Sequence, residues 1–421
     1  MKEKFLLLLL AVSSILVGCS ESDSIESGNE TLSEIPILLN AAGSFDAGIA
    51  ASQSAPATRA SVDSIPELGK VGIYCMAGRK TGVTGSDLAA DPNWGVSLNH
   101  GADYATTTNG VYWNNLKCSV DPATGLISVD ENVDGVKQEY IWYYPITSWY
   151  AYDFYGYHPY NKDSVKCQIK KITDTRYKVV ADVTIDGKTD LLWGRSEIKN
   201  PNENENNKYA YSARYFRNAS ETAAKMKFEH CLSQFRFFIQ PREKNETPNS
   251  NLHNFETLAV KEITMHNVAD KLQLLIADSD PNEQREVGQV TNVTAEKDLK
   301  NFTLCDENGD PISKNPVPFH VQGNVAQKRQ VGDCIMVCPY DNVYYMSMVI
   351  CDKDNHDNVY RSEKLMTIKL NNELPFEPGK RYNIYITATG VTEINVVTEV
   401  APWEDYNANQ ADDENLNFDI D

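Results

Sequence analysis

The chain has 421 residues, 41% of them apolar, and a net charge of −20 at pH 7. This length is enough for two or three domains with buried cores, and the apolar content excludes a disordered chain. The acidic balance excludes nucleic-acid binding and attraction to an anionic membrane surface, because both require clusters of Lys and Arg.

The N-terminus carries the features of an export signal. Two lysines precede an apolar run over residues 5–17, which is followed by Gly and Cys19. The run is too short for a comfortable membrane span and has the charged front of a signal peptide. A small residue before Cys19 resembles a bacterial lipobox, so lipid on Cys19 would hold the mature chain to a membrane. The alternative is an ordinary signal peptide with a chance cysteine. We therefore expect a signal peptide over 1–18 and a solvated tether over 19–34.

Residues 35–60 combine a short strand with a linker. Three alternating apolar residues predict the strand: Ile35, Ile37 and Leu39. Pro36 restricts it to a sheet edge or to the start of a strand. Small residues follow, as in a flexible linker, and Arg59 stands alone within it. An isolated arginine in an exposed linker is a target for a trypsin-like protease, which would leave Ala60 as the new N-terminus.

The rest of the chain predicts many strands and few helices. The expected strands cover residues 70–78, 139–146, 150–160, 177–185, 189–195, 226–240, 258–268, 317–323, 334–340, 344–351, 363–370, 382–390 and 394–403. Their spacing, with Gly, Pro, Asn and Asp between them, indicates β-sandwich domains. The polar stretch 199–225 is the best interior boundary, so we expect an all-β fold with domains over 61–222 and 223–405.

The expected strand at 226–240 changes phase along its length. Phe228 and Leu232 share one face, and Phe235 and Phe237 then share the other. A bulge or bend between the two halves would produce this change.

The acidic tail 406–421 ends in another alternating pattern. Its apolar residues are Leu416, Phe418 and Ile420. A period of two is typical of a strand with one buried face, although the polar stretch before it looks unable to fold. Two readings stay open, a strand that docks beyond its own domain and an edge strand within it.

Signals of catalysis or metal binding are weak. The chain has no GxSxG, P-loop, HExxH or CxxC motif, and its seven histidines are dispersed. His230 lies on an apolar strand face and is expected in the core. The loop 352–363 has carboxylates at EF-hand spacing, but Asp357 occupies the place that needs glycine, which favours a solvated hairpin. We expect no enzyme, no metal and no cofactor.

The aromatic run at 140–160 has two interpretations. With Trp142, Trp149 and neighbouring tyrosines it could form a glycan-binding platform. Alternatively, its rings pack into the core from alternating strands.

The cysteines do not form the dense pattern of a small disulfide-stapled domain. Cys334 and Cys338 are expected on one strand, about 13 Å apart, which is too far for a mutual disulfide. Buried free thiols are the favoured interpretation.

Several segments together resemble the fimbrillin, or Mfa-like, superfamily, whose members are outer-membrane lipoproteins that build type V pili. The resemblance runs from about residue 16 to 405 and rests on "LVGC", "ATRA", "WYAYDFYGYHPY", "DLLWGR", "FEHCLSQFRF", "FEPGKRYNIYITATG" and "VAPWED". It implies two transthyretin-like, Greek-key β-sandwich domains.

The resemblance also implies a route of assembly. The precursor would be an outer-membrane lipoprotein lipidated at Cys19, and its own first strand would complete the N-terminal domain. An arginine-specific extracellular protease would cut between Arg59 and Ala60. The strand with Ile37 and Leu39 would then leave, and the tail strand of another subunit would fill its place. The implied partners are other pilus subunits, that protease and a host or bacterial surface receptor, and the site of action is the fimbrium. The alternative is a surface glycan-binding lipoprotein.

Overall fold

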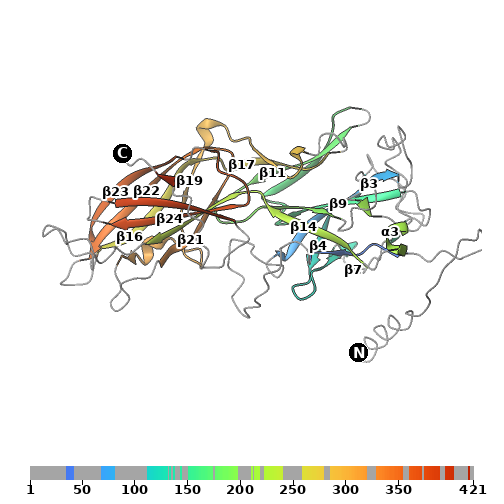
Figure 1. Cartoon of the computed structure of the whole chain (residues 1–421), viewed down its shortest axis with the longest axis horizontal. Coiled ribbons are helices and arrows are strands. Elements are labelled where there is room, and N and C mark those ends of the chain that lie inside the picture. Colours follow the sequence, from blue (N-terminus) through green and yellow to red (C-terminus); the bar gives the residue numbers. More distant parts are fainter. Residues whose placement is uncertain are drawn as a thin grey trace, which may run out of the picture. The chain divides into compact units, whose positions relative to one another are not determined.

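The computed structural model describes most of the predicted strands (Figure 1). The described residues are 35–41, 68–80, 111–130, 132–133, 136–137, 143–144, 150–173, 176–197, 210–211, 213–218, 222–239, 258–278, 285–319, 329–353, 360–371, 374–388, 394–402 and 416–417. The chain divides into two units, Met1–Ser33 and Glu34–Asp421, and every described residue lies in the second. Strands dominate, and the helical segments include only short pieces such as α3 (Ala213–Asn218), η5 (Glu296–Asp298) and η6 (Ile312–Lys314). The predicted all-β class is confirmed.

Seven strands close into a barrel-like ring. Their order is β12-β14-β2-β5-β4-β3-β9, and β9 pairs back with β12. The strands are β2 (Leu39–Asn40), β3 (Lys70–Lys80), β4 (Val111–Val120), β5 (Leu126–Val129), β9 (Tyr150–His158), β12 (Leu192–Ser196) and β14 (Ala224–His230). β13 (Ala210–Tyr211) pairs with the N-terminal half of β9, at Tyr152 and Asp153. This ring takes the place of the two-sheet sandwich expected in the first half of the chain.

One face of the ring strands is packed into a single core. Its members include Leu39, Ile73, Cys75, Trp113, Phe154, Leu192, Met226 and Phe228. Where β9 meets β12, Gly156 is paired with Gly194. A Cβ on Gly194 would lie 2.7 Å from the ring of Phe228, and one on Gly156 would lie 3.2 Å from it. The two glycines therefore leave the space that Phe228 fills at the closure of the ring.

A four-stranded sheet, β10-β11-β17-β18, combines early and late strands. They are β10 (Val165–Lys171), β11 (Tyr177–Thr184), β17 (Lys271–Asp278) and β18 (Val290–Asn292). Arg176 donates two hydrogen bonds to the buried carboxylate of Asp278, at 3.1 and 2.7 Å. One sheet thus draws strands from both sides of the predicted division between 222 and 223, and that division stays a prediction.

The late strands form two five-stranded sheets around a shared core. One has the order β21-β15-β24-β25-β26, and the other has β19-β16-β22-β23 with β20 paired to β16. The strands are β15 (Ser233–Ile239), β16 (Leu258–Val268), β19 (Lys300–Thr303), β20 (Val317–Pro318), β21 (Arg329–Val337), β22 (Val343–Lys353), β23 (Tyr360–Asn371), β24 (Lys380–Ala388), β25 (Ile394–Pro402) and β26 (Leu416–Asn417). Two short ladders, β1 (Ile35–Pro36) with β8 (Tyr143–Tyr144) and β6 (Asn132–Val133) with β7 (Val136–Lys137), complete the described strands.

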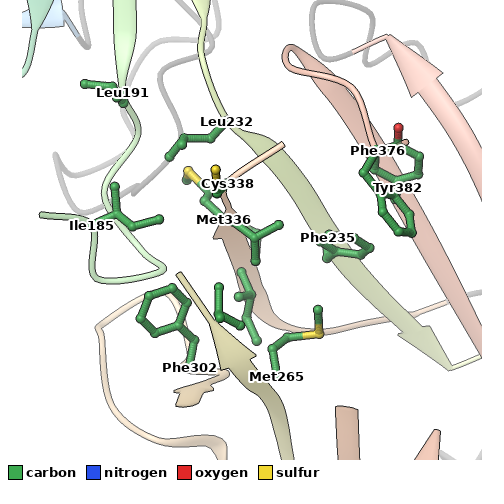
Figure 2. Close-up of a cluster of buried hydrophobic side chains, with 14 of the residues drawn as sticks. Ile185, Leu191, Leu232, Phe235, Met265, Phe302, Met336, Cys338, Phe376 and Tyr382 are labelled. Carbon is green, nitrogen blue, oxygen red and sulfur yellow. The ribbon is translucent and has the colours of Figure 1, made fainter. Parts of the chain in front are cut away.

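Aromatic rings join these two sheets. Phe235 of β15 packs edge-on against Tyr344 of β22, with ring centroids 5.6 Å apart. It also stacks on Tyr382 and meets Phe376, as Figure 2 shows. Rings in this geometry attract each other beyond the area that they bury. The late strands therefore form a sandwich of the expected kind, and its transthyretin-like topology stays a prediction.

The predicted change of phase is present, but the expected single strand at 226–240 is two strands, and the break lies just before the place where the bend was expected. β14 ends at His230 in the ring, and β15 begins at Ser233 in the sandwich. The buried positions alternate in one phase along β14 and in the other phase from Phe235 onward. Two residues, Cys231 and Leu232, carry the chain from one sheet to the other.

The eight described cysteines form no disulfide with one another, as the sequence favours. Seven are buried and Cys167 is half-buried; the buried ones are Cys75, Cys118, Cys231, Cys305, Cys334, Cys338 and Cys351. Burial raises the pKa of Cys338 to about 12 and likewise raises that of Cys334, so both stay protonated at neutral pH.

Candidate functional site

The most informative feature of the ring is its shortest strand, β2. It lies between β14, to which it is parallel, and β5, to which it is antiparallel. Leu39 pairs with Ala224 on one side and with Ile127 on the other. No local pattern predicts these partners, since β2 precedes β5 by more than 80 residues and β14 by more than 180. The first segment of the chain therefore occupies a place between two later strands.

Backbone hydrogen bonds hold this segment on both sides. The amide of Ala224 donates to the carbonyl of Leu38 at 2.8 Å, and the amide of Ala41 donates to the carbonyl of Gly125 at 2.8 Å. At its tip, Asn40 Nδ2 donates to the carbonyl of Thr124 at 3.2 Å. The segment thus satisfies backbone groups of β5, β14 and their ends that would otherwise face a gap.

The side chains of the segment alternate as the sequence predicts. Ile37 is 6% exposed, Leu39 is 2% exposed and Ala41 is fully buried. Ile35 is half-buried and packs against the same core. The structure thus brings all three predicted strand residues to one apolar core. Burial of Ile37 and Leu39 is worth about 3–6 kcal/mol in total, at about 1.5–3 kcal/mol each.

Removing this segment would leave a defined groove. β5 and β14 would each present an unpaired edge, and the core would open where Leu39 packs. An unpaired edge beside an apolar groove is a template for a strand from another chain. The seat of β2, defined here as the facing edges of β5 and β14 with the core beneath them, is the candidate functional site.

The tail strand has a partner within its own chain. β26 forms the edge of the five-stranded sheet, where Leu416 pairs with Thr398 and Asn417 pairs with Val397 of β25. This pairing is the intramolecular arrangement that the sequence left open. Phe418 and Ile420 lie outside the described residues.

Five other predicted site residues also lie outside the described residues: Cys19, Arg59, Ala60, Trp142 and Trp149. Most described rings of the aromatic run are buried, and Tyr160 at its end is half-buried. Tyr152 and Phe154 are fully buried, and Tyr144 is 1% exposed. Phe154 packs against Trp113 with ring centroids 5.7 Å apart. Tyr144, Tyr152 and Phe154 therefore fill the core of the seven-stranded ring and offer no exposed platform.

Sequence reasoning found one of the two strands that form the seat, since most of β14 lies within the expected strand at 226–240. It missed β5, which has only four residues, and it also missed the neighbouring β4, where the pair Asn114-Asn115 interrupts the alternation. Ala41 was missed as well, although a small residue at the fourth alternating position, after Ile35, Ile37 and Leu39, was a signal for it. The hydrogen bond from Ala224 to Leu38 had no signal in the sequence.

His230 has the structural role that the sequence favours. His230 is 7% exposed and its Nδ1 lies 2.8 Å from Asp190 Oδ2, which confirms it as a core histidine. The loop at 352–363 joins two antiparallel strands, β22 and β23, as expected for a hairpin. The described residues contain no group of three or more His, Cys, Asp or Glu that could hold a metal ion. Among the same residues, no helix has the length and apolar character needed to cross a membrane.

A family model described as fimbrillin-like matches residues 58–403. The chain belongs to this fimbrillin-like family. Membership supports a role as a subunit of cell-surface fimbriae that assembles with other subunits and acts in adhesion. The match begins after β2 and ends before β26, so the fimbrillin-like core contains the seat and excludes both terminal strands.

Solved structures of similar proteins span most of the fimbrillin-like chain. A candidate cell adhesion protein from Bacteroides uniformis is 13% identical, with a TM-score of 0.44, over 88% of this chain and 99% of that one. A fimbrial protein from Bacteroides vulgatus is 11% identical, with a TM-score of 0.40, over 88% and 100%. The fimbrial anchor protein Mfa2 from Porphyromonas gingivalis is 9% identical, with a TM-score of 0.30, over 88% and 98%. No curated protein sequence matches the chain.

Proposed function

We propose that the chain is the precursor of a fimbrial subunit that assembles by exchange of its first strand. The observation that carries the proposal is the position of β2, a two-residue strand that completes the ring between β5 and β14. The segment that contains this strand precedes all the other ring strands and buries two large apolar residues, Ile37 and Leu39, so it is removable in one step. Its departure leaves a groove that another strand of alternating pattern fits.

Export and lipidation precede assembly in this proposal. Residues 1–18 direct export, lipid on Cys19 holds the precursor in the outer membrane, and 19–34 form the tether. The arginine-specific protease then cuts between Arg59 and Ala60. Because Arg59 lies between β2 and β3, this cut separates β2 from the rest of the ring strands and leaves it held by non-covalent contacts alone.

The incoming strand is the tail of another subunit. Leu416, Phe418 and Ile420 have the same alternation as Ile35, Ile37 and Leu39, so they fit the same seat. In the described part of the tail, two residues of β26 pair with β25 at the edge of the sheet, and a ladder of this length is easy to release. A head-to-tail contact of this kind grows into a filament.

Two finer features also belong to the proposal. The chain would divide into transthyretin-like domains at 61–222 and 223–405, with the second domain contributing β14 to the ring. The ring would be the receiving part and the sandwich the donating part. A host or bacterial surface receptor would bind the assembled fimbrium. Polymer formation and adhesion, rather than catalysis, are the functions that this arrangement serves.

The first test is the mature N-terminus and its link to polymer formation. Mass spectrometry of the native protein should find lipid on Cys19 in the precursor and Ala60 as the first residue of the polymer. Arg59→Ala and the charge-preserving Arg59→Lys should both block cleavage by an arginine-specific protease and block polymer. Normal polymer from both variants would refute the proposal. A chain that stays lipidated and uncut in its native fimbria would instead be an anchor subunit.

Truncation after Glu414 tests the tail. Loss of polymer from a monomer with unchanged unfolding would support donation of Leu416, Phe418 and Ile420. A destabilised monomer that still polymerises would show that β26 is a permanent edge strand, and would refute the donor assignment.

A further inference from the structure

A second site lies on the other side of the ring strands, where β3 and β4 pair irregularly. Ile73 pairs with Leu116 and Cys75 pairs with Trp113, so two residues of β4, Asn114 and Asn115, stand opposite Tyr74 alone. This is a β-bulge, and Asn115 adopts a left-handed backbone with φ of 58°. Asparagine tolerates this conformation better than most residues. Bulges often re-aim side chains beside binding sites.

The bulge opens onto a cavity of about 450 Å³. Its walls include Tyr74, the two bulge asparagines, Tyr160, Lys162 and Gln168. This volume falls within the range of about 300–1,000 Å³ that is usual for small-molecule sites. The cavity is thus large enough for one or two sugar rings or a molecule of similar size.

An aromatic ring forms one wall. Tyr160 is half-buried and stacks on the buried ring of Tyr157, with centroids 6.3 Å apart and an angle of 28° between the planes. Nζ of the exposed Lys162 lies 5.9 Å from the centroid of Tyr160. Stacking on Tyr157 fixes the orientation of Tyr160 before any ligand arrives.

The amides of the wall are also held in place. Tyr157 Oη donates to Asn115 Oδ1 at 2.8 Å, which leaves the two N–H donors of Asn115 Nδ2 for another partner. Gln168 Nε2 donates to Asp182 Oδ2 at 3.0 Å, which leaves Gln168 Oε1 as an acceptor. Asn114 is exposed at the rim. Gly72 makes the arrangement feasible, because a Cβ there would lie 2.7 Å from Asn115 Oδ1.

The wall chemistry excludes several ligand classes. Among the described lining residues, Ile169 alone is aliphatic, so an apolar ligand would gain little. Lys162 is the one cation in the same described lining, so a polyphosphate would find few partners. Cys167 lies between the hydroxyls of Tyr74 and Tyr157, and burial raises the pKa of its thiol, so it is a poor nucleophile. What remains is a ligand rich in hydroxyl groups with one apolar face.

We propose that this cavity, between the β3–β4 bulge and β10, binds a saccharide unit. The C–H face of a sugar ring stacks on Tyr160, and adjacent hydroxyls hydrogen-bond to Asn114, Asn115 and Gln168. Lys162 at the rim adds contact with a sugar that carries one carboxylate. This site differs from a platform built on Trp142 and Trp149, and it does not depend on strand exchange.

The test is saturation-transfer NMR and calorimetry on the full chain. The probes are galactose, N-acetylglucosamine, glucuronic acid and sialic acid, with glycerol as a hydroxyl-bearing control. Tyr160→Ala should weaken binding about tenfold, and Asn114→Ala should weaken it about two- to tenfold, since a hydrogen bond is worth about 0.5–1.5 kcal/mol. Tyr345→Ala removes a 45% exposed tyrosine on β22 and should leave affinity unchanged.

The acidic and neutral probes separate two versions of the proposal. If the chain prefers glucuronic or sialic acid and Lys162→Gln abolishes this preference, the ligand of the cavity is an acidic sugar. If all four sugars bind equally, the carboxylate adds nothing, and the ligand is a neutral sugar. Absence of saturation transfer from every sugar at a concentration of about 10 mM, at which a site with a Kd of about 1 mM would be mostly occupied, would overturn the proposal. Equal loss of binding in Tyr345→Ala and Tyr160→Ala would also overturn it.

Discussion

Replacement of Leu39 by Ala tests directly whether the first strand stabilises the ring. Leu39 is 2% exposed and belongs to the ring core. Truncating a buried leucine costs about 2–5 kcal/mol, because the transfer free energy of the lost atoms and the cost of the cavity add. Leu365, 65% exposed on β23, is the matched control, and Leu365→Ala should change the free energy of unfolding by less than about 0.5 kcal/mol.

The assay must report on the ring itself. Hydrogen exchange of the Ala224 amide is suitable, because this amide donates to Leu38 across the seat. A loss of 2 kcal/mol speeds exchange through local opening about 30-fold, since each 1.4 kcal/mol is about a factor of ten. Leu39→Ala should therefore exchange at least about 30-fold faster than the unsubstituted chain at Ala224, and Leu365→Ala should not.

The same variant then separates a seated strand from a released one. In the chain cut after Arg59 and freed of its first segment, Leu39→Ala should have no effect, because the residue has left. Exchange at Ala224 should be fast in both cut chains and should slow again when a peptide of residues 34–42 is added. Equal exchange at Ala224 in the intact Leu39→Ala and Leu365→Ala chains would refute the claim that the strand's burial stabilises the ring.

Three further predictions concern the framework around the site. Burial lowers the pKa of His158, whose titratable neighbours are Asp190 and His230, so below a pH of about 6.5 the unfolded chain binds more protons than the folded one. Stability should then fall by up to about 1.4 kcal/mol per pH unit, and His158→Gln should flatten this slope in urea unfolding between pH 7 and 5. Asp278→Ala should lower the free energy of unfolding by about 3–5 kcal/mol, because it leaves the charge of Arg176 without its carboxylate partner. An unchanged urea midpoint would contradict the role of this ion pair. Gly194→Ala should lower the free energy of unfolding by about 1–3 kcal/mol, because the added methyl group clashes with the side chain of Phe228. A melting temperature equal to that of the unsubstituted chain would show that the seven-stranded ring accommodates the methyl group.

Local patterns in the sequence were sufficient for the fold class and for several elements. Alternation predicted that Ile37 and Leu39 share a buried face, and the structure buries both. The change of phase near Leu232 predicted the bend that separates β14 from β15. These features are local, because successive side chains of a strand point to opposite faces and the two-residue period can be seen in a short stretch of sequence.

Only the tertiary structure decided which strands meet. The seat of β2 joins Leu39 to Ile127 and Ala224, and the shared sheet joins β11 to β17. Ladder hydrogen bonds use the same N–H and C=O groups at every residue, so a strand's own sequence does not specify its neighbours. The same reason explains the tail: alternation predicted a strand at Leu416, but its pairing with Thr398 of β25 is a property of the fold. Pairing depends on which edges the rest of the chain leaves open, and that is settled by the burial of all the strands together.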